Sequence, residues 1–203
     1  MPLTMAYHGC DRQTALDLLG GSLFLPSERE YDWLGTGIYF WENDALRAFQ
    51  WASEPRRKFT SPSLIGAAIE LGNCLDLTTQ AGIDAVKIAY DQFILISQEV
   101  GKEIPENLDP ASALNGDKVL RYLDCAVMNH LFDLIMDAQR FDPQIQTHAS
   151  VRALFPEGKE LYPGAGFRDK THIQICVRNP QQILGVFRLP EWQREELELP
   201  VLY

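Results

Sequence analysis

Strand-like segments at both ends of the chain, with two long helical segments between them, are the feature that most constrains its fold. Apolar segments typical of strands lie at residues 3–7, 38–40 and 64–77, and again at 173–177 and 183–189. Residues 79–99 and 117–139 instead space their apolar side chains as amphipathic helices do. Strands early and late, with helices concentrated between them, predict an α+β fold.

Capping residues predict two shorter helices near the N-terminus. Asp11 is placed to cap a helix that ends at Gly20-Gly21, and Asn43 or Asp44 to cap a second helix that runs to about Ala52. Residues 150–171 contain several prolines and glycines, so we expect one long structured loop there. Such loops are often functional.

Composition limits the class of protein. The chain has 203 residues, of which 46% are apolar and 23% charged, values that are ordinary for one globular domain. No apolar stretch approaches the ~20 residues that span a bilayer, and the N-terminus does not read as a secretory signal. Its net charge of −10 argues against a general electrostatic patch for nucleic acid.

The cysteines also limit the class of protein. They are widely scattered, at positions 10, 74, 125 and 176, without the spacing of a zinc site or a disulfide framework. We therefore expect no metal, no membrane attachment and a cytoplasmic protein.

Three short motifs place polar groups at the end of, or within, an apolar strand. They are Tyr7-His8-Gly9, the segment GTGIYF at 35–40 and the segment HIQICV at 172–177. Taken singly, each has a structural explanation, as a hydrogen-bonded histidine, a tight turn before a core strand, or an outward-facing glutamine. The two glycines are not a phosphate-binding loop, because no Lys-Ser or Lys-Thr follows them.

The order and separation of these motifs resemble the ADP-ribosyltransferase family, in the branch of diphtheria toxin and the poly(ADP-ribose) polymerases. That His-Tyr-Glu branch has a YHG-like strand, a GxGIYF-like strand, a helix with alanine and aromatic residues, and a late strand bearing Glu or Gln. Here the helix reads AFQWA at 48–52. The resemblance covers roughly residues 3–75 and 165–189. It implies a split β-sheet core in a single domain, 1–203, with a helical insertion at about 79–140.

The resemblance also implies a role for each matching residue. His8 would hydrogen-bond the adenosine-side ribose of NAD and help hold the nicotinamide amide, which the backbone of Gly9 would clamp. Tyr39 would stack on the nicotinamide ring, with Trp51 as the opposite wall. Gly37 is expected to contact NAD as well.

Gln174 falls at the third catalytic position and is the main departure from the family, which usually has glutamate there. An amide offers only a dipole to a cationic sugar, although its carbonyl still accepts a hydrogen bond. In the family, loss of the glutamate accompanies loss of chain elongation, so we expect transfer of a single ADP-ribose at most. Glu157 and Glu160, just before this strand, would contribute charge or contact the acceptor, or are solvated loop acids.

Three further side chains are candidates for the same site. By strand alternation, His172 points the same way as Gln174 and would line the site. Asp32 and Trp33 would shape a loop over bound NAD.

The predicted function is therefore that of an NAD-dependent mono-ADP-ribosyltransferase acting on a protein or a nucleic acid, with NAD as co-substrate. A toxin or defence effector with a neutralising partner protein is one setting for such an enzyme. Three alternatives stay open: an NAD glycohydrolase, a non-catalytic interaction module, and the related RNA 2′-phosphotransferase. The last needs clustered arginines, and Arg56-Arg57 is the only adjacent pair.

Overall fold

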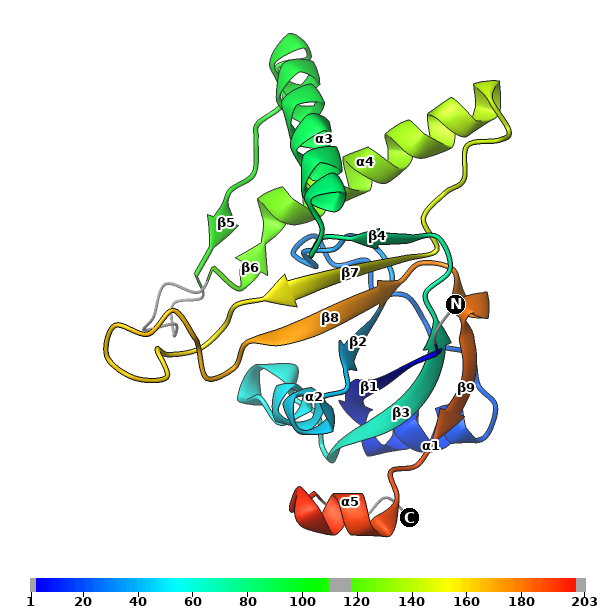
Figure 1. Cartoon of the computed structure of the whole chain (residues 1–203), viewed down its shortest axis with the longest axis vertical. Helices are drawn as coiled ribbons and strands as arrows, with labels where there is room; N and C mark the ends of the chain where they lie inside the picture. The colour runs from blue at the N-terminus through cyan, green and yellow to red at the C-terminus, as the bar shows by residue number, and fades with distance from the viewer. Residues whose placement is uncertain (1–2, 110–117, 200–203) are drawn as a thin grey trace.

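The computed structural model describes residues 3–109 and 118–199, and it has the predicted α+β architecture. In these residues a seven-stranded, mostly antiparallel sheet has the order β4-β7-β8-β2-β1-β3-β9 (Figure 1). The short strands β5 and β6 pair separately. The strands are β1 (Leu3–Asp11), β2 (Ile38–Glu42), β3 (Pro62–Glu70), β4 (Cys74–Asp76), β5 (Asn107–Leu108), β6 (Leu120–Arg121), β7 (Ser150–Phe155), β8 (His172–Val177) and β9 (Ile183–Phe187).

The two short helices near the N-terminus begin where their capping residues predict. The side chain of Asp11 accepts from the backbone N–H of Gln13, and Asp44, not Asn43, accepts from that of Arg47. None of the helices in the described residues has the length and apolar character needed to cross a membrane. The helices are α1 (Arg12–Leu19), α2 (Ala45–Ala52), α3 (Gln80–Glu99), α4 (Tyr122–Phe141) and α5 (Glu191–Glu196), with short 3-10 turns η1 (Pro55–Arg57) and η2 (Pro180–Gln182).

The sheet is nearly divided between β1 and β2. These two strands share only two residue pairs, Ala6 with Glu42 and Tyr7 with Trp41, whereas β1 pairs with β3 at nine positions. Because pairing with β3 continues, β1 runs longer than the predicted segment 3–7. One half of the sheet is therefore β4-β7-β8-β2 and the other is β1-β3-β9, and the two separate beyond Tyr7.

The core fills both faces of this sheet. On one face, α2 packs through Ala45 and Ala48 against Trp41, and the α3–α4 pair covers the part formed by β4, β7 and β8. On the other face, α1 packs through Leu18 against Ile65. Fully burying an aliphatic or aromatic side chain contributes about 1.5–3 kcal/mol, so these clusters hold the two halves of the sheet in place.

The two predicted helical segments between the early and late strands are present as α3 and α4, which pack against each other and extend away from the sheet at the top of Figure 1. The predicted apolar stripe of α4 is confirmed, since Val127 and Leu131 are buried against α3. The predicted start at 117 lies outside the described residues. Helix α4 begins only at Tyr122, because the two residues before it pair with β5.

The prediction of a single loop over 150–171 was wrong for its first six residues. Strand β7 occupies 150–155 and lies between β4 and β8 in the sheet. Its alternate residues Val151, Ala153 and Phe155 are buried, which is the strand period of two. The prolines and glycines that suggested a loop all follow β7, so the loop is limited to residues 156–171.

Candidate functional site

A cavity of about 820 Å³ opens where β1 and β2 separate. This volume is within the range of small-molecule sites, about 300–1,000 Å³. Its walls come from β1, the loop before β2, β2 itself, α2 with η1, and the neighbouring ends of β7 and β8. The structure brings all the predicted site residues to this one cavity: His8, Gly9, Gly37, Tyr39, Trp51 and Gln174.

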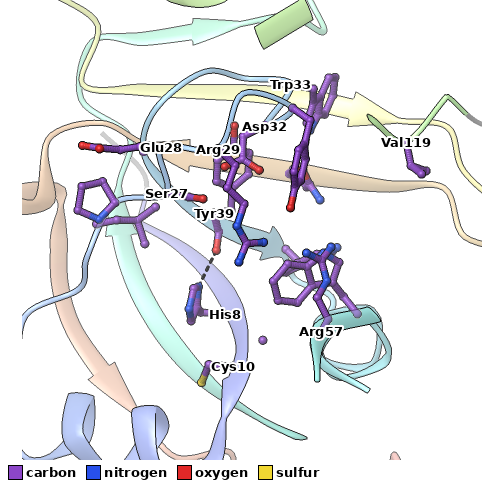
Figure 2. Close-up of a pocket in the computed structure, with 18 of the residues that line it drawn as sticks. His8, Cys10, Ser27, Glu28, Arg29, Asp32, Trp33, Tyr39, Arg57 and Val119 are labelled. Atoms are coloured by element: carbon purple, nitrogen blue, oxygen red, sulfur yellow. Dashed lines mark hydrogen bonds between the residues drawn. The ribbon is translucent and has the colours of Figure 1, made fainter. Parts of the chain in front are cut away.

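His8 spans the division of the sheet. Its Nδ1 lies 2.8 Å from the main-chain oxygen of Tyr39, the dashed line in Figure 2. A carbonyl oxygen only accepts, so Nδ1 carries the proton and Nε2 is left as an acceptor. Burial lowers the pKa of His8, which keeps the ring neutral at pH 7. Within the described part of the chain Nε2 has no hydrogen-bond partner, so it is available to a hydroxyl donor.

Gly9 combines a packing role with exposed main-chain groups. A Cβ at Gly9 would overlap the carbonyl oxygen of Ala48 on α2, so only glycine allows the helix to approach β1 this closely. The carbonyl of Met5 accepts from Asn43 on the β2 side, and strand alternation directs the N–H and C=O of Gly9 to that same side. Pairing with β2 has already ended at Tyr7. The main chain of Gly9 therefore faces the opening.

Tyr39 is a fixed part of the wall. Its hydroxyl donates to the carbonyl of Gly35 at 2.7 Å and accepts from the N–H of Leu34 at 3.1 Å, which closes the preceding turn. Gly35 has a positive φ of 79°. The same turn is held by α4, because Asn129 accepts from the N–H of Thr36 at 3.1 Å. Helix α4 thus supports the loop that carries one wall of the cavity.

Trp51 shares its wall with Trp41, a residue outside the predicted site. The two rings lie 5.2 Å apart, and the guanidinium of Arg57 lies 3.7 Å from the centre of the Trp51 ring. Trp41 is buried, and its Nε1 has no hydrogen-bond partner within the residues that the structure describes. Because Trp41 stands two residues after Tyr39 on β2, strand alternation was the signal that places both on one face.

Gln174 lies within the half-sheet, not on an edge strand. It pairs with Trp41 of β2 on one side and with Ala153 of β7 on the other. Its Oε1 accepts from Nε1 of Trp33 at 2.6 Å, which fixes the orientation of the amide at the cavity wall. The neighbouring His172 does not line the cavity, because its ring stacks on Phe155 at 5.5 Å.

Three arginines from two separate segments line the cavity, and only two of them are adjacent in sequence. Arg56 and Arg57 come from η1, while Arg29 comes from the loop before β2. Arg29 and Arg57 extend toward the same space in Figure 2. Burial and the positive charge of Arg56 lower the pKa of Arg57 to about 10. Glu54 neutralises only part of this charge, through a 2.6 Å contact with Arg56, so the group is suited to bind an anion.

Two acids that line the cavity are largely withdrawn from solvent. Burial raises the pKa of Asp32, and its Oδ2 has no hydrogen-bond partner among the described residues. Glu157 is 8% exposed and forms an ion pair of 2.6 Å with Arg47 of α2. Glu160, in contrast, is exposed and lies outside the cavity. The two loop acids that the sequence could not separate therefore have different environments.

Comparison with known proteins identifies a relative but no family. No family model matches the chain, and no solved structure matches it. The chain is 28% identical over 208 residues to the uncharacterized protein MJ0359 of Methanocaldococcus jannaschii, an alignment that covers 92% of this chain and 85% of that protein. The name of this relative states no activity.

Proposed function

We propose that this protein is an NAD-dependent mono-ADP-ribosyltransferase with an ADP-ribosyltransferase-like split-sheet core. The enzyme breaks the nicotinamide–ribose bond of NAD and transfers the ADP-ribose to a macromolecular acceptor. The observation that carries this proposal is the convergence of His8, Gly9 and Gln174, from distant segments, on one cavity at the division of the sheet.

The nicotinamide end of NAD matches the groups around Gly9. A primary carboxamide needs one donor and one acceptor, which the N–H and C=O of a strand facing an opening supply together. The ring of Tyr39 offers a flat surface for the pyridine ring, and Trp51 lines the same cavity with the guanidinium of Arg57 stacked 3.7 Å from its ring centre. Nε2 of the neutral His8 is an acceptor suited to a ribose hydroxyl.

The middle of NAD is a negatively charged diphosphate that joins its two riboses. Arg29, Arg56 and Arg57 form the cationic part of the same wall. Guanidinium groups bind phosphate oxygens with paired, charge-assisted hydrogen bonds. Neutral polar groups and cationic groups together within one cavity of about 820 Å³ fit a dinucleotide better than a small uncharged substrate.

Bond cleavage requires the site to tolerate positive charge on the ribose. As the C1′–N bond breaks, its electron pair neutralises the pyridinium nitrogen of nicotinamide and leaves a cation-like sugar. Dipoles and carboxylates that are fixed before the reaction stabilise such a charge most effectively. Gln174 contributes a dipole whose orientation is set by Trp33. Aromatic walls that align the leaving ring reduce the entropic part of the barrier.

Incubation of the protein with NAD labelled on its adenylate part tests the proposal. Label on a protein or nucleic acid supports transfer, whereas free labelled ADP-ribose alone indicates an NAD glycohydrolase. Binding without cleavage indicates a non-catalytic module, and no binding of NAD contradicts all three. His8→Asn should abolish NAD consumption, while His148→Asn, outside the cavity, should leave it unchanged.

The arginine group also favours a second candidate function. Three clustered guanidinium groups would hold a terminal phosphate as well as a diphosphate, and the related RNA 2′-phosphotransferase consumes NAD while removing such a group. An oligoribonucleotide with an internal 2′-phosphate separates the two activities. NAD-dependent loss of that phosphate supports this candidate, and its retention during NAD consumption supports the transferase.

A further inference from the structure

We propose that Glu157 is a catalytic residue that supplies the carboxylate missing at position 174, and that Arg47 positions it. This inference rests on the proposed cleavage of NAD. It assigns the negative charge of the site to the end of β7 instead of to β8.

Glu157 and Gln174 line the same cavity although 17 residues separate them in sequence. Strand β7 pairs with β8 throughout its length, with Ala153 opposite Gln174 and Phe155 opposite His172. Glu157 follows two residues after the end of β7, and its main-chain oxygen accepts from the N–H of Lys170, two residues before β8 begins. It is one of the cavity-lining residues, as Gln174 is.

Arg47 holds this carboxylate in place from outside the cavity lining. Its Nη2 lies 2.6 Å from Oε2 of Glu157, and Arg47 is 4% exposed and does not itself line the cavity. The more distant Glu54, 3.9 Å from Nη2, is its other ionic neighbour among the described residues. A carboxylate has about four acceptor sites, so one direct bond to Arg47 leaves acceptor capacity for a ligand.

A purely structural role explains this ion pair less well. Burying two charges costs several kcal/mol in desolvation, so a buried ion pair adds little net stability over apolar side chains of similar size. Placing one member of the pair on the wall of a ligand-sized cavity gives it a use that a core position would not.

The carboxylate would act at two points of the reaction. While the C1′–N bond breaks and its electrons pass to nicotinamide, the charge of Glu157 stabilises the developing cation at C1′. The acceptor then attacks C1′, its proton passes to the Glu157 carboxylate, and water removes that proton afterwards. Removing one such stabilising group from an active site lowers kcat by about 10²–10³.

Matched variants test this assignment. Glu157→Gln keeps the size and removes the charge, whereas Glu160→Gln makes the same change at the exposed acid outside the cavity. We expect Glu157→Gln to lower kcat for NAD consumption about 100-fold or more, with little change in KM for NAD. Glu160→Gln should retain the wild-type rate. Wild-type turnover in Glu157→Gln overturns the inference.

The positioning role of Arg47 has its own readout. Arg47→Lys keeps a cation near Glu157 and should retain part of the activity, whereas Arg47→Met should lose it with an unchanged KM. Equal activity in these two variants overturns the role of Arg47. If Glu157→Gln alone does not fold, the double variant Arg47→Met/Glu157→Gln leaves no unpaired buried charge. That folded variant should bind NAD and not consume it, and wild-type consumption would overturn the inference.

Failure of this inference is distinct from failure of the proposed function. A wild-type protein that neither binds nor consumes NAD contradicts the proposed function. A wild-type protein that consumes NAD, beside a Glu157→Gln variant that does so equally fast, contradicts only the assignment of Glu157.

Discussion

Replacing His8 by alanine tests the bond that bridges the two halves of the sheet. The substitution leaves the buried carbonyl of Tyr39 without the imidazole donor, which costs about 1–3 kcal/mol. It also removes ring contacts at 5.4 Å with Phe24 and 5.6 Å with Phe40, each worth about 0.5–1.5 kcal/mol beyond area burial. We therefore expect the free energy of unfolding to fall by about 2–6 kcal/mol.

His8→Asn is the matched control, because its side-chain amide can still donate to the carbonyl of Tyr39. It should lose clearly less stability than His8→Ala, while both variants lose NAD binding together with the Nε2 acceptor. Urea denaturation gives the free energies, and in a chain of this size 1 kcal/mol shifts Tm by about 2–4 °C. A loss below about 1 kcal/mol in His8→Ala, or equal losses in the two variants, would refute this account of the hydrogen bond.

Three further predictions concern pH and packing. Burial lowers the pKa of three histidines below 6.5. Their contribution to stability should therefore be complete above pH 6.5 and decline as the pH falls from there. A constant free energy of unfolding from pH 7 to 5 would contradict this. These histidines are His8, His148 and His172. Burial raises the pKa of Asp32, so the folded state favours its protonated form and loses that advantage as the pH rises. Asp32→Asn should therefore raise Tm at pH 7 but not near pH 3. A lower Tm at pH 7 would disprove this. Gly9→Ala should destabilise the protein by about 1–3 kcal/mol, because the added Cβ overlaps α2. Gly185→Ala should not, because a Cβ at Gly185 meets no atom within 4 Å. Equal Tm values for the two variants would contradict this prediction.

Much of the fold was predictable because its signals are local. The caps at Asp11 and Asp44 act within one turn, and the apolar spacing of α3 and α4 repeats over many residues. Strand β7 was missed because it is only six residues long, and because the prolines and glycines that follow it are typical of a loop. Its parallel partner β4 ends 74 residues earlier in the chain, so no local signal in the sequence predicted that pairing.

Site residues that belong to sequence motifs could be predicted. Contacts between segments that are distant in the sequence could not. His8, Tyr39 and Gln174 stand in recognisable strands, and all line the cavity. The proximity of Arg29 to Arg57 depends on how the loop before β2 folds back over β1, which no spacing in the sequence encodes. The burial of Glu157 depends similarly on its contact with α2, 110 residues earlier.

The central claim is that the division of the sheet binds the nicotinamide end of NAD. A crystal structure with an NAD analogue that has an uncleavable C-glycosidic bond tests it most directly. The account predicts the carboxamide within hydrogen-bond distance of both the N–H and the C=O of Gly9, with the pyridine ring against Tyr39. An analogue bound elsewhere on the protein, or bound in the cavity with its carboxamide away from Gly9, would contradict the account.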